Sequence, residues 1–151
     1  MGDIAHEVAL TVGPDLVRTM MSDPKFFDIL ANLEAAQQCV LTAHDGRVTW
    51  ARTLRIGPLE VSVEDEYQWR DFRTGRFTSS LVRAPMGISG SLTTEMIVQS
   101  EGNNSVWSLT GEYTVNLPMI FRSYRTQIAQ VLPELLSLRG EASLAWSQLG
   151  A

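Results

Sequence analysis

Alternation of apolar and polar side chains dominates the first 117 residues of the chain, and a helical spacing of apolar residues replaces it afterwards. Residues 4–12 alternate and predict a strand with one buried face. Two short helices are expected next, because Pro14 suits a first helical turn and Asp23 with Pro24 forms an N-cap and a first helical position. Turn-bounded segments then predict six further strands, over residues 37–43, 48–56, 61–69, 77–83, 88–98 and 106–117.

The last part of the chain predicts one long amphipathic helix. Apolar side chains recur every three or four residues from Phe121 to Trp146, which gives the helix a buried stripe. Pro133 lies inside this helix and should kink it near residues 129–132, because proline removes a backbone hydrogen bond. We therefore expect a single α+β domain over residues 1–151. In it, a curved antiparallel sheet of six to seven strands wraps around the long C-terminal helix and leaves space beneath it.

Composition narrows the class of protein without identifying a ligand. Hydrophobic residues make up 44% of the 151 residues, which is enough for one domain with a real core. The formal net charge of −5 leaves no basic excess for general nucleic-acid binding. No apolar run approaches the ~20 residues that span a bilayer, and the N-terminus does not resemble a signal peptide. We expect a cytoplasmic protein that does not bind nucleic acid and has no transmembrane segment; a homodimer stays open.

Candidate chemistry is sparse. The single cysteine, Cys39, cannot form an internal disulfide and is expected to be a small buried hydrophobe. The two histidines, His6 and His44, are too few for a closed zinc site, and His44 is expected to be exposed beside a turn. No nucleotide-binding glycine motif or serine-nucleophile elbow occurs. We therefore expect no metal and no cofactor, and we assign no catalytic residue.

Two neighbouring strands each carry one charge within an apolar row. Arg52 shares its face with Trp50 and Leu54, and Asp65 shares its face with Val63 and Tyr67. If residues 57–60 form the connection, Ile56 pairs with Val61, and Arg52 lies directly opposite Asp65 on the inner face. A buried charge is costly alone and tolerable when paired. The two residues are therefore a structural ion pair, or a polar anchor for one end of a ligand, unless a bulge turns one of them outward.

Strand parity places a further set of side chains on the inner face. Aromatic residues with polar tips suit a cavity that is mostly apolar, although plain core packing explains each of the tryptophans equally well. Gly111 is expected to leave space on this face. His6 lies in the inner row of the first strand and could act as a base or be structural. Besides Arg52 and Asp65, the predicted ligand-binding residues are His6, Trp50, Tyr67, Trp69, Phe77, Ser79, Thr94, Met96, Trp107, Tyr113, Tyr124 and Ile128.

The order of elements resembles the helix-grip fold of the START and Bet v 1-like superfamily (SRPBCC), which includes polyketide cyclases and lipid-transport proteins. Residues 109–118 (LTGEYTVNLP) and 141–146 (EASLAW) look like the end of an actinobacterial family in this superfamily, DUF2505. Residues 21–27 (MSDPKFF) look like a helix junction that is common near the N-terminus of such proteins. The resemblance implies an internal cavity for apolar ligands and transfers no catalytic residues.

Three functions remain open at this point. The first is binding or carrying a small hydrophobic ligand, such as a lipid, a sterol-like compound or a polyketide. The second is a cyclase or dehydratase that uses His6, or Arg52 and Asp65 together with Tyr67. The third is a co-chaperone-like protein-interaction module with a small or filled cavity. The mostly apolar inner rows favour the first.

Overall fold

The structure of the chain is a computed structural model that describes residues 2–149; the side chains at positions 124, 128 and 129 lie outside that description. Along the chain its elements are β1 (Gly2–Leu10), α1 (Pro14–Met20), α2 (Pro24–Glu34), β2 (Gln37–His44), β3 (Arg47–Ile56), β4 (Leu59–Trp69), β5 (Thr74–Arg83), the short 3-10 helix η1 (Pro85–Gly87), β6 (Ser89–Glu101), β7 (Asn104–Asn116), the 3-10 helix η2 (Met119–Tyr124) and α3 (Arg125–Leu149).

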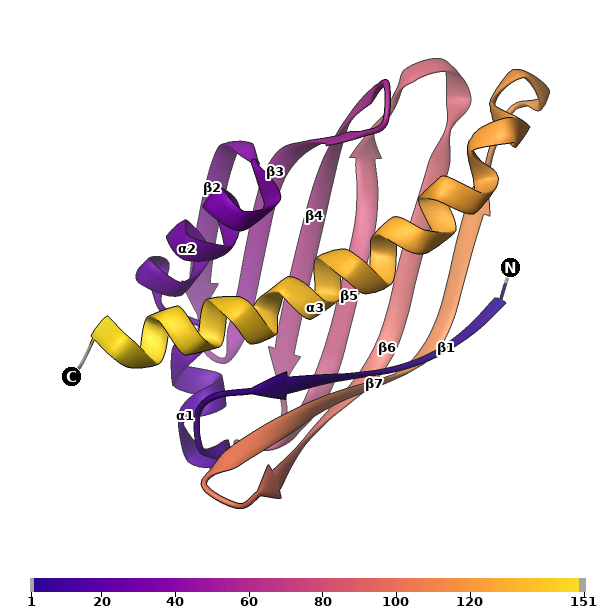
Figure 1. The fold of residues 1–151 in the computed structure, drawn as a ribbon. Helices are drawn as coiled ribbons and strands as arrows, with labels where there is room; N and C mark the ends of the chain where they lie inside the picture. Colours follow the sequence, from indigo (N-terminus) through magenta and orange to yellow (C-terminus); the bar gives the residue numbers. More distant parts are fainter. Residues whose placement is uncertain (1, 150–151) are drawn as a thin grey trace.

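The described strands form one curved antiparallel sheet that wraps around α3. Its order is β1-β7-β6-β5-β4-β3-β2, so that the first strand closes one edge beside the last. The helix α3 crosses the concave face of the sheet, α2 lies near β2, and α1 contacts β6 and β7 (Figure 1). The α+β fold expected from the alternation, with its two short helices and long C-terminal helix, is therefore confirmed.

Local sequence explains where the helices begin. Pro14 and Pro24 each stand at the first helical position, where a missing amide hydrogen costs nothing. The Asp23 carboxylate caps α2 by accepting a hydrogen bond from the Lys25 amide at 3.0 Å. The last helix differs from the expectation at its start, because residues 119–124 form the tighter η2 and α3 begins only at Arg125. Pro133 lies inside α3 without ending it, and the kink expected beside it stays a prediction.

The pairing of β3 with β4 corrects the register expected from the sequence by two residues. Ile56 pairs with Leu59 and not with Val61, because the connection is a two-residue turn at positions 57–58. Arg52 therefore lies opposite Val63, and Asp65 lies opposite Trp50. Side chains along a strand alternate between its faces, so a shift of two keeps each residue on its face. Arg52 and Asp65 consequently remain inward-facing as diagonal neighbours.

The core is divided into two clusters along the sheet. The larger cluster lies under α1, α2 and the C-terminal half of α3, and it contains the rings of Trp50, Tyr67, Phe77 and Trp107. The smaller cluster is aliphatic and consists of Leu54, Leu59, Val61, Val63 and Ile88. Arg52 on β3 and Asp65 on β4 each lie between the two clusters along their strands, so charged side chains stand at the boundary.

The C-terminal half of α3 is fixed closely to β1 and α2. A side chain at Gly140 would approach the carbonyl oxygen of Ala9 to 2.8 Å, so glycine allows the helix to lie directly on the strand. The Thr11 amide donates a hydrogen bond to Ser143 Oγ at 2.8 Å. The Trp146 indole donates to Asp23 Oδ2 at 2.9 Å. These contacts hold one half of α3 in place over the larger cluster.

Gly111 has a different role from the one expected. A Cβ atom there would lie 2.0 Å from the Thr93 carbonyl oxygen and 2.7 Å from Thr94 Cα, so the glycine permits close approach of β6 and β7 and leaves no free space. Cys39 is also exposed, contrary to expectation, since it lies within a register irregularity at the start of the edge strand β2. His44 is exposed, as predicted.

The close approach at Gly111 gives a stability prediction. Gly111→Ala should lower the free energy of unfolding by about 3 kcal/mol, the upper part of the range for overpacking, because the collision is with backbone atoms. The matched control is Gly13→Ala, whose Cβ would meet the Asn103 carbonyl at an ordinary 3.6 Å. Urea unfolding of both variants measures the difference. Equal stability of the two variants would contradict the assigned packing of β6 on β7.

Candidate functional site

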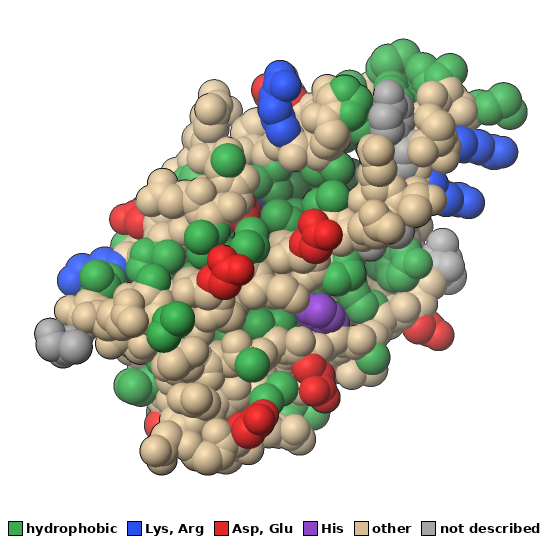
Figure 2. Space-filling model, in the orientation of Figure 1, with side chains coloured by type: hydrophobic (Ala, Val, Ile, Leu, Met, Phe, Trp, Pro, Cys, Tyr) green, Lys and Arg blue, Asp and Glu red, His purple; other side chains and the backbone are tan. Residues whose placement is uncertain are grey.

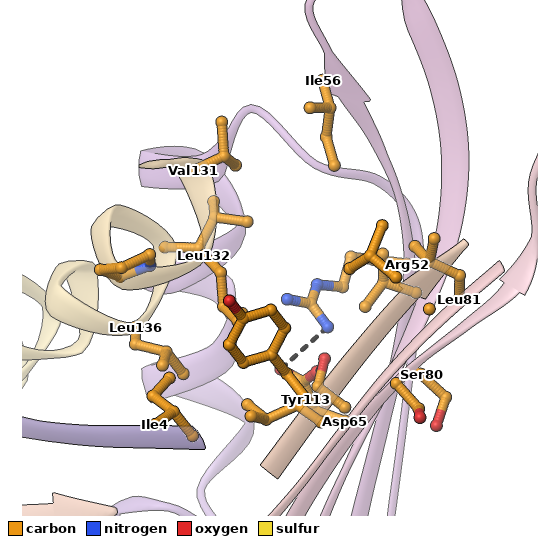
Figure 3. Close-up of a pocket in the computed structure, with 18 of the residues that line it drawn as sticks. Ile4, Arg52, Ile56, Asp65, Ser80, Leu81, Tyr113, Val131, Leu132 and Leu136 are labelled. Atoms are coloured by element: carbon orange, nitrogen blue, oxygen red, sulfur yellow. Dashed lines mark hydrogen bonds and ion pairs between the residues drawn. The ribbon is translucent and has the colours of Figure 1, made fainter. Parts of the chain in front are cut away.

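A cavity of about 460 Å³ lies between the concave face of the sheet and the N-terminal half of α3. In Figure 3, Ile4, Leu132 and Leu136 form one wall, Ile56 and Leu81 stand across from them, and the Tyr113 ring projects between. Most of the lining side chains are aliphatic, and they come from β1, β3–β7 and α3. This half of α3 therefore covers a space that its described side chains do not fill.

Arg52 and Asp65 form the polar floor of the cavity. They are only 3% and 1% exposed, and Arg52 Nη1 lies 2.9 Å from Asp65 Oδ2 (Figure 3). Ser79 Oγ donates a 2.6 Å hydrogen bond to the other Asp65 oxygen. The Arg52 guanidinium also lies over the Trp50 ring, 4.2 Å from its centre. The ion pair that the sequence suggested is therefore present on the inner face, reached through a different register.

Two further charged residues complete this network, and sequence reasoning missed both. Arg139 of α3 donates from Nη2 to Asp65 Oδ2 at 2.7 Å and from Nε to the Tyr67 hydroxyl at 2.8 Å. Glu34, the last residue of α2, accepts from Arg52 Nε at 3.1 Å and from its Nη2 at 3.4 Å. We call Glu34, Arg52, Asp65 and Arg139 the buried ion network.

The buried ion network is balanced in charge, with two guanidinium groups and two carboxylates. Burial alone would raise the pKa of Asp65, but the positive charges of Arg52 and Arg139 outweigh it and lower that pKa. For Glu34, burial outweighs Arg52, so its pKa is raised. Burial opposes the charge of Arg52, and the carboxylates of Asp65 and Glu34 overcome it and raise the Arg52 pKa. Asp65 is thus held as a carboxylate between two cations.

One nitrogen of the buried ion network has no hydrogen-bond acceptor among the described residues. Arg52 Nη1 is buried and close to Asp65 Oδ2, yet its N–H groups are not directed at that oxygen. Most buried donors in proteins are paired, so an unpaired donor of this kind needs an explanation. Because Arg52 lines the cavity, an acceptor placed in the cavity could complete its bonding.

Five of the aromatic residues predicted to bind a ligand lie in the packed core next to the cavity. Phe77 and Trp107 lie 5.4 and 5.6 Å from the Arg139 guanidinium carbon and enclose it with Tyr67. Thr94 Oγ1 donates to the Phe77 carbonyl at 2.9 Å, which satisfies the threonine within the sheet. The residues that lie in this core are Trp50, Tyr67, Trp69, Phe77, Thr94, Met96 and Trp107. None of these seven residues is part of the described cavity lining, and a ligand-binding role for each stays a prediction.

The remaining predicted site residues divide into three groups. Ser79 and Tyr113 line the cavity beside Arg52 and Asp65. His6 lies away from the cavity wall, where its Nε2 and Ser137 Oγ are 3.1 Å apart at the contact of β1 with α3. The side chains of Tyr124 and Ile128 lie outside the described part of the structure. A ligand-binding role for each of these residues stays a prediction.

A helical-spacing signal for Arg139 and Glu34 is present in the sequence. Arg139 lies four residues after Leu135 and three before Ala142, within the buried stripe of α3. Glu34 lies four residues after Leu30, on the buried side of α2. Each of these two helices thus carries one charged residue on its buried side. These residues could have been identified from the sequence as partners for Arg52 and Asp65 on the sheet.

Several solved structures resemble this chain in fold. TTHA0849 from Thermus thermophilus aligns with 97% of this chain and 99% of its own, at a TM-score of 0.69 and 17% identity. The Zhui aromatase/cyclase from a Streptomyces species aligns over 93% of each chain, at 0.62 and 13% identity. Norcoclaurine synthase from Thalictrum flavum, in complex with dopamine and hydroxybenzaldehyde, covers 97% of this chain and 87% of its own, at 0.58 and 14% identity. The chain therefore has the helix-grip fold of Bet v 1-like proteins.

Comparison with models of protein families and with curated proteins finds no match to this sequence. The resemblance to DUF2505 accordingly stays a prediction. Within residues 2–149, no helix is long and apolar enough to cross a membrane. No group of three or more His, Cys, Asp or Glu side chains in this part of the chain could hold a metal ion.

The buried ion network predicts a large cost for removing its central carboxylate. Asp65→Asn leaves Arg52 and Arg139 with Glu34 as the remaining carboxylate of the network, and should lower the free energy of unfolding by about 3–5 kcal/mol. The matched control is Glu95→Gln, which breaks an exposed ion pair with Arg70 and should cost about 0–1 kcal/mol. Urea unfolding at neutral pH compares them. A cost for Asp65→Asn as small as that of the control would contradict the network.

Tyr67 predicts a loss of stability in alkaline solution. Burial, against the nearby charge of Arg139, raises the pKa of Tyr67 to about 12, compared with about 10 for an unfolded tyrosine. The folded state thus holds the phenol proton more tightly. The stability from this difference is complete below about pH 10 and is lost as the pH rises towards 12, by up to about 1.4 kcal/mol per pH unit.

The variant Tyr67→Phe isolates this effect, because it removes the ionisable group and retains the ring. Its unfolding free energy should fall less steeply than that of the unmodified chain between about pH 10 and 11.5. Urea unfolding at several pH values gives both slopes. Parallel curves for the two proteins would show that Tyr67 does not hold its proton in the folded state.

Proposed function

We propose that this protein binds a small, mostly apolar molecule in the cavity beneath α3, with one uncharged hydrogen-bond acceptor of that molecule at Arg52. The volume of about 460 Å³ falls within the range of small-molecule sites, and the aliphatic walls favour an apolar body. The bound structures of proteins with this fold give general support, since norcoclaurine synthase holds small aromatic molecules.

The observation that carries the proposal is the buried nitrogen Arg52 Nη1, which forms an ion pair with Asp65 but no aligned hydrogen bond. A guanidinium offers five N–H donors, and those on Nε and Nη2 are directed to Glu34. Arg52 lines the cavity, and its buried Nη1 lies 2.9 Å from Asp65 Oδ2 without an aligned hydrogen bond. An oxygen atom entering the cavity would therefore meet a preformed, charged donor, which fixes the orientation of the ligand.

The charge balance of the network favours an uncharged acceptor. Two guanidinium groups already face two carboxylates, so a ligand carboxylate at the floor would bring an uncompensated negative charge into a buried site. A carbonyl or hydroxyl oxygen accepts a hydrogen bond without adding charge. We therefore propose a ketone, ester or alcohol class of ligand, with its apolar part between α3 and the sheet.

Binding explains the site better than catalysis does. Asp65 is a weak base, because two arginines lower its pKa and Ser79 bonds its other oxygen. Tyr67 is a weak acid with its hydroxyl bonded by Arg139 beneath the network. His6 bonds Ser137 away from the cavity wall. A carrier or binding protein therefore accounts for these groups, which are fixed and not poised to exchange protons.

Three compounds with the same apolar ring system test the proposal: naphthalene, and the equally large 2-acetylnaphthalene and 2-naphthoate. Fluorescence titration should show that naphthalene binds, that the ketone binds about tenfold more tightly, and that the naphthoate lacks this gain. Arg52→Lys keeps the positive charge but loses the planar donor fork, so it should abolish the ketone's advantage and retain naphthalene binding. Arg83→Gln on β5 is the control, exposed and absent from the cavity lining.

The outcomes separate the two parts of the proposal. No binding of any of the three compounds would contradict an apolar binding cavity. Binding of naphthalene and 2-acetylnaphthalene with equal affinity would contradict recognition by Arg52. Tightest binding of the naphthoate would show that an anion is accepted and would overturn the argument from charge balance.

A further inference from the structure

Exposed apolar side chains gather at the end of the molecule formed by η1 and η2. Met119 and Ile120 of η2 are 77% and 64% exposed, and Met86 of η1 is 65% exposed. Pairing of Ser89 with Asn116 brings the segment before β6 beside the segment after β7, so the two turns project from adjacent strands. Figure 2 shows hydrophobic side chains massed over this end. We call Met86, Met119 and Ile120 the apolar tip.

Arginines that form no ion pair with the described residues lie in or next to the segments that carry the apolar tip. Residues 76–94 and 113–133 contain four arginines and no Asp or Glu, although the whole chain has 17 acidic residues and a net charge of −5. Arg83, Arg122 and Arg125 are exposed and form no ion pair with the described residues. Lys and Arg side chains lie beside the apolar group in Figure 2, and acidic side chains spread over other parts of the same face.

We propose that the apolar tip docks the protein on a lipid bilayer that contains anionic headgroups. Short turns that carry methionine and isoleucine can insert these side chains into the boundary between headgroups and acyl chains. The apolar side chains then leave water, and the backbone of the turn stays hydrated. Arginines around such a tip are attracted to anionic lipids. Charge also determines which part of the protein faces an anionic bilayer. The remainder of the chain is acidic, so the bilayer repels it.

Because the apolar tip lies beside the cavity, docking would bring the bilayer close to the cavity. Arg125, at the start of α3, lines the cavity and also follows η2 directly in the chain. An apolar molecule that leaves a bilayer at this point would reach the cavity by a short route. The docking itself rests on the tip alone and holds whatever the cavity contains.

Cosedimentation of the full chain with large vesicles tests the proposal. Vesicles of phosphatidylcholine with roughly a third phosphatidylglycerol should bind the protein at least about tenfold more tightly than phosphatidylcholine alone, and added salt should reduce the difference. Met119→Ser with Ile120→Ser should weaken binding about tenfold or more. Arg83→Gln with Arg122→Gln should weaken it about 25-fold, from about fivefold for each arginine.

Two exposed residues far from the tip in the sequence serve as matched controls. Val40→Ser changes an exposed apolar side chain on β2, and Lys25→Gln removes an exposed positive charge on α2; both should bind as the unmodified chain does. Melting temperatures confirm that all variants fold. The proposal is overturned if the chain ignores anionic vesicles at low salt, which would point to a protein partner. It is also overturned if the serine variant binds fully, since attraction by charge alone would then suffice.

Discussion

Asp65 is the carboxylate on which the sheet and both covering helices converge. Its two oxygens receive Arg52 from β3, Ser79 from β5 and Arg139 from α3, and Arg52 in turn bonds Glu34 at the end of α2. Hydrogen bonds between charged groups are directional, so these contacts specify where α3 and α2 lie on the sheet more narrowly than apolar packing could. A buried carboxylate cannot remain unpaired at neutral pH without a large cost. The helices and the network therefore assemble together.

The same network explains why a cavity exists where it does. Towards α1 and α2, the rings of Phe77 and Trp107 pack around Arg139 and fill the space beneath the helix. Towards the other end, the sheet presents short aliphatic side chains, and the half of α3 that carries Pro133 lies above them. Gly140 brings the opposite half of the helix onto β1. A helix held closely against one end of a curved sheet stands away from it at the other.

The periodicity of the sequence predicted the elements and the faces of the strands, because both depend on residues close together in the chain. Alternation places Arg52 and Asp65 on the inner face whatever the exact pairing of the strands. This assignment held even though the expected register was wrong by two residues. Periodicity does not predict whether an inward side chain is packed in the core or lines a cavity. Alternation assigns Trp107 and Tyr113 to the same face, yet Trp107 is enclosed in the core and Tyr113 lines the cavity. Arg139 and Glu34 were missed because their partners are distant in the chain. Gly111 was misread because the approach of β6 to β7 is a property of the curved sheet.

The division of the core into two clusters separates what folds the chain from what a ligand would meet. The ring-rich cluster and the buried ion network lie under the closely held half of α3, whereas the cavity is walled largely by aliphatic residues of the other half. Exchanges among side chains that face an unfilled space cost less folding energy than exchanges in a packed core. The cavity wall can therefore drift in evolution while the scaffold stays constant. A fold arranged in this way can acquire new ligands by small steps, each of which leaves a stable protein.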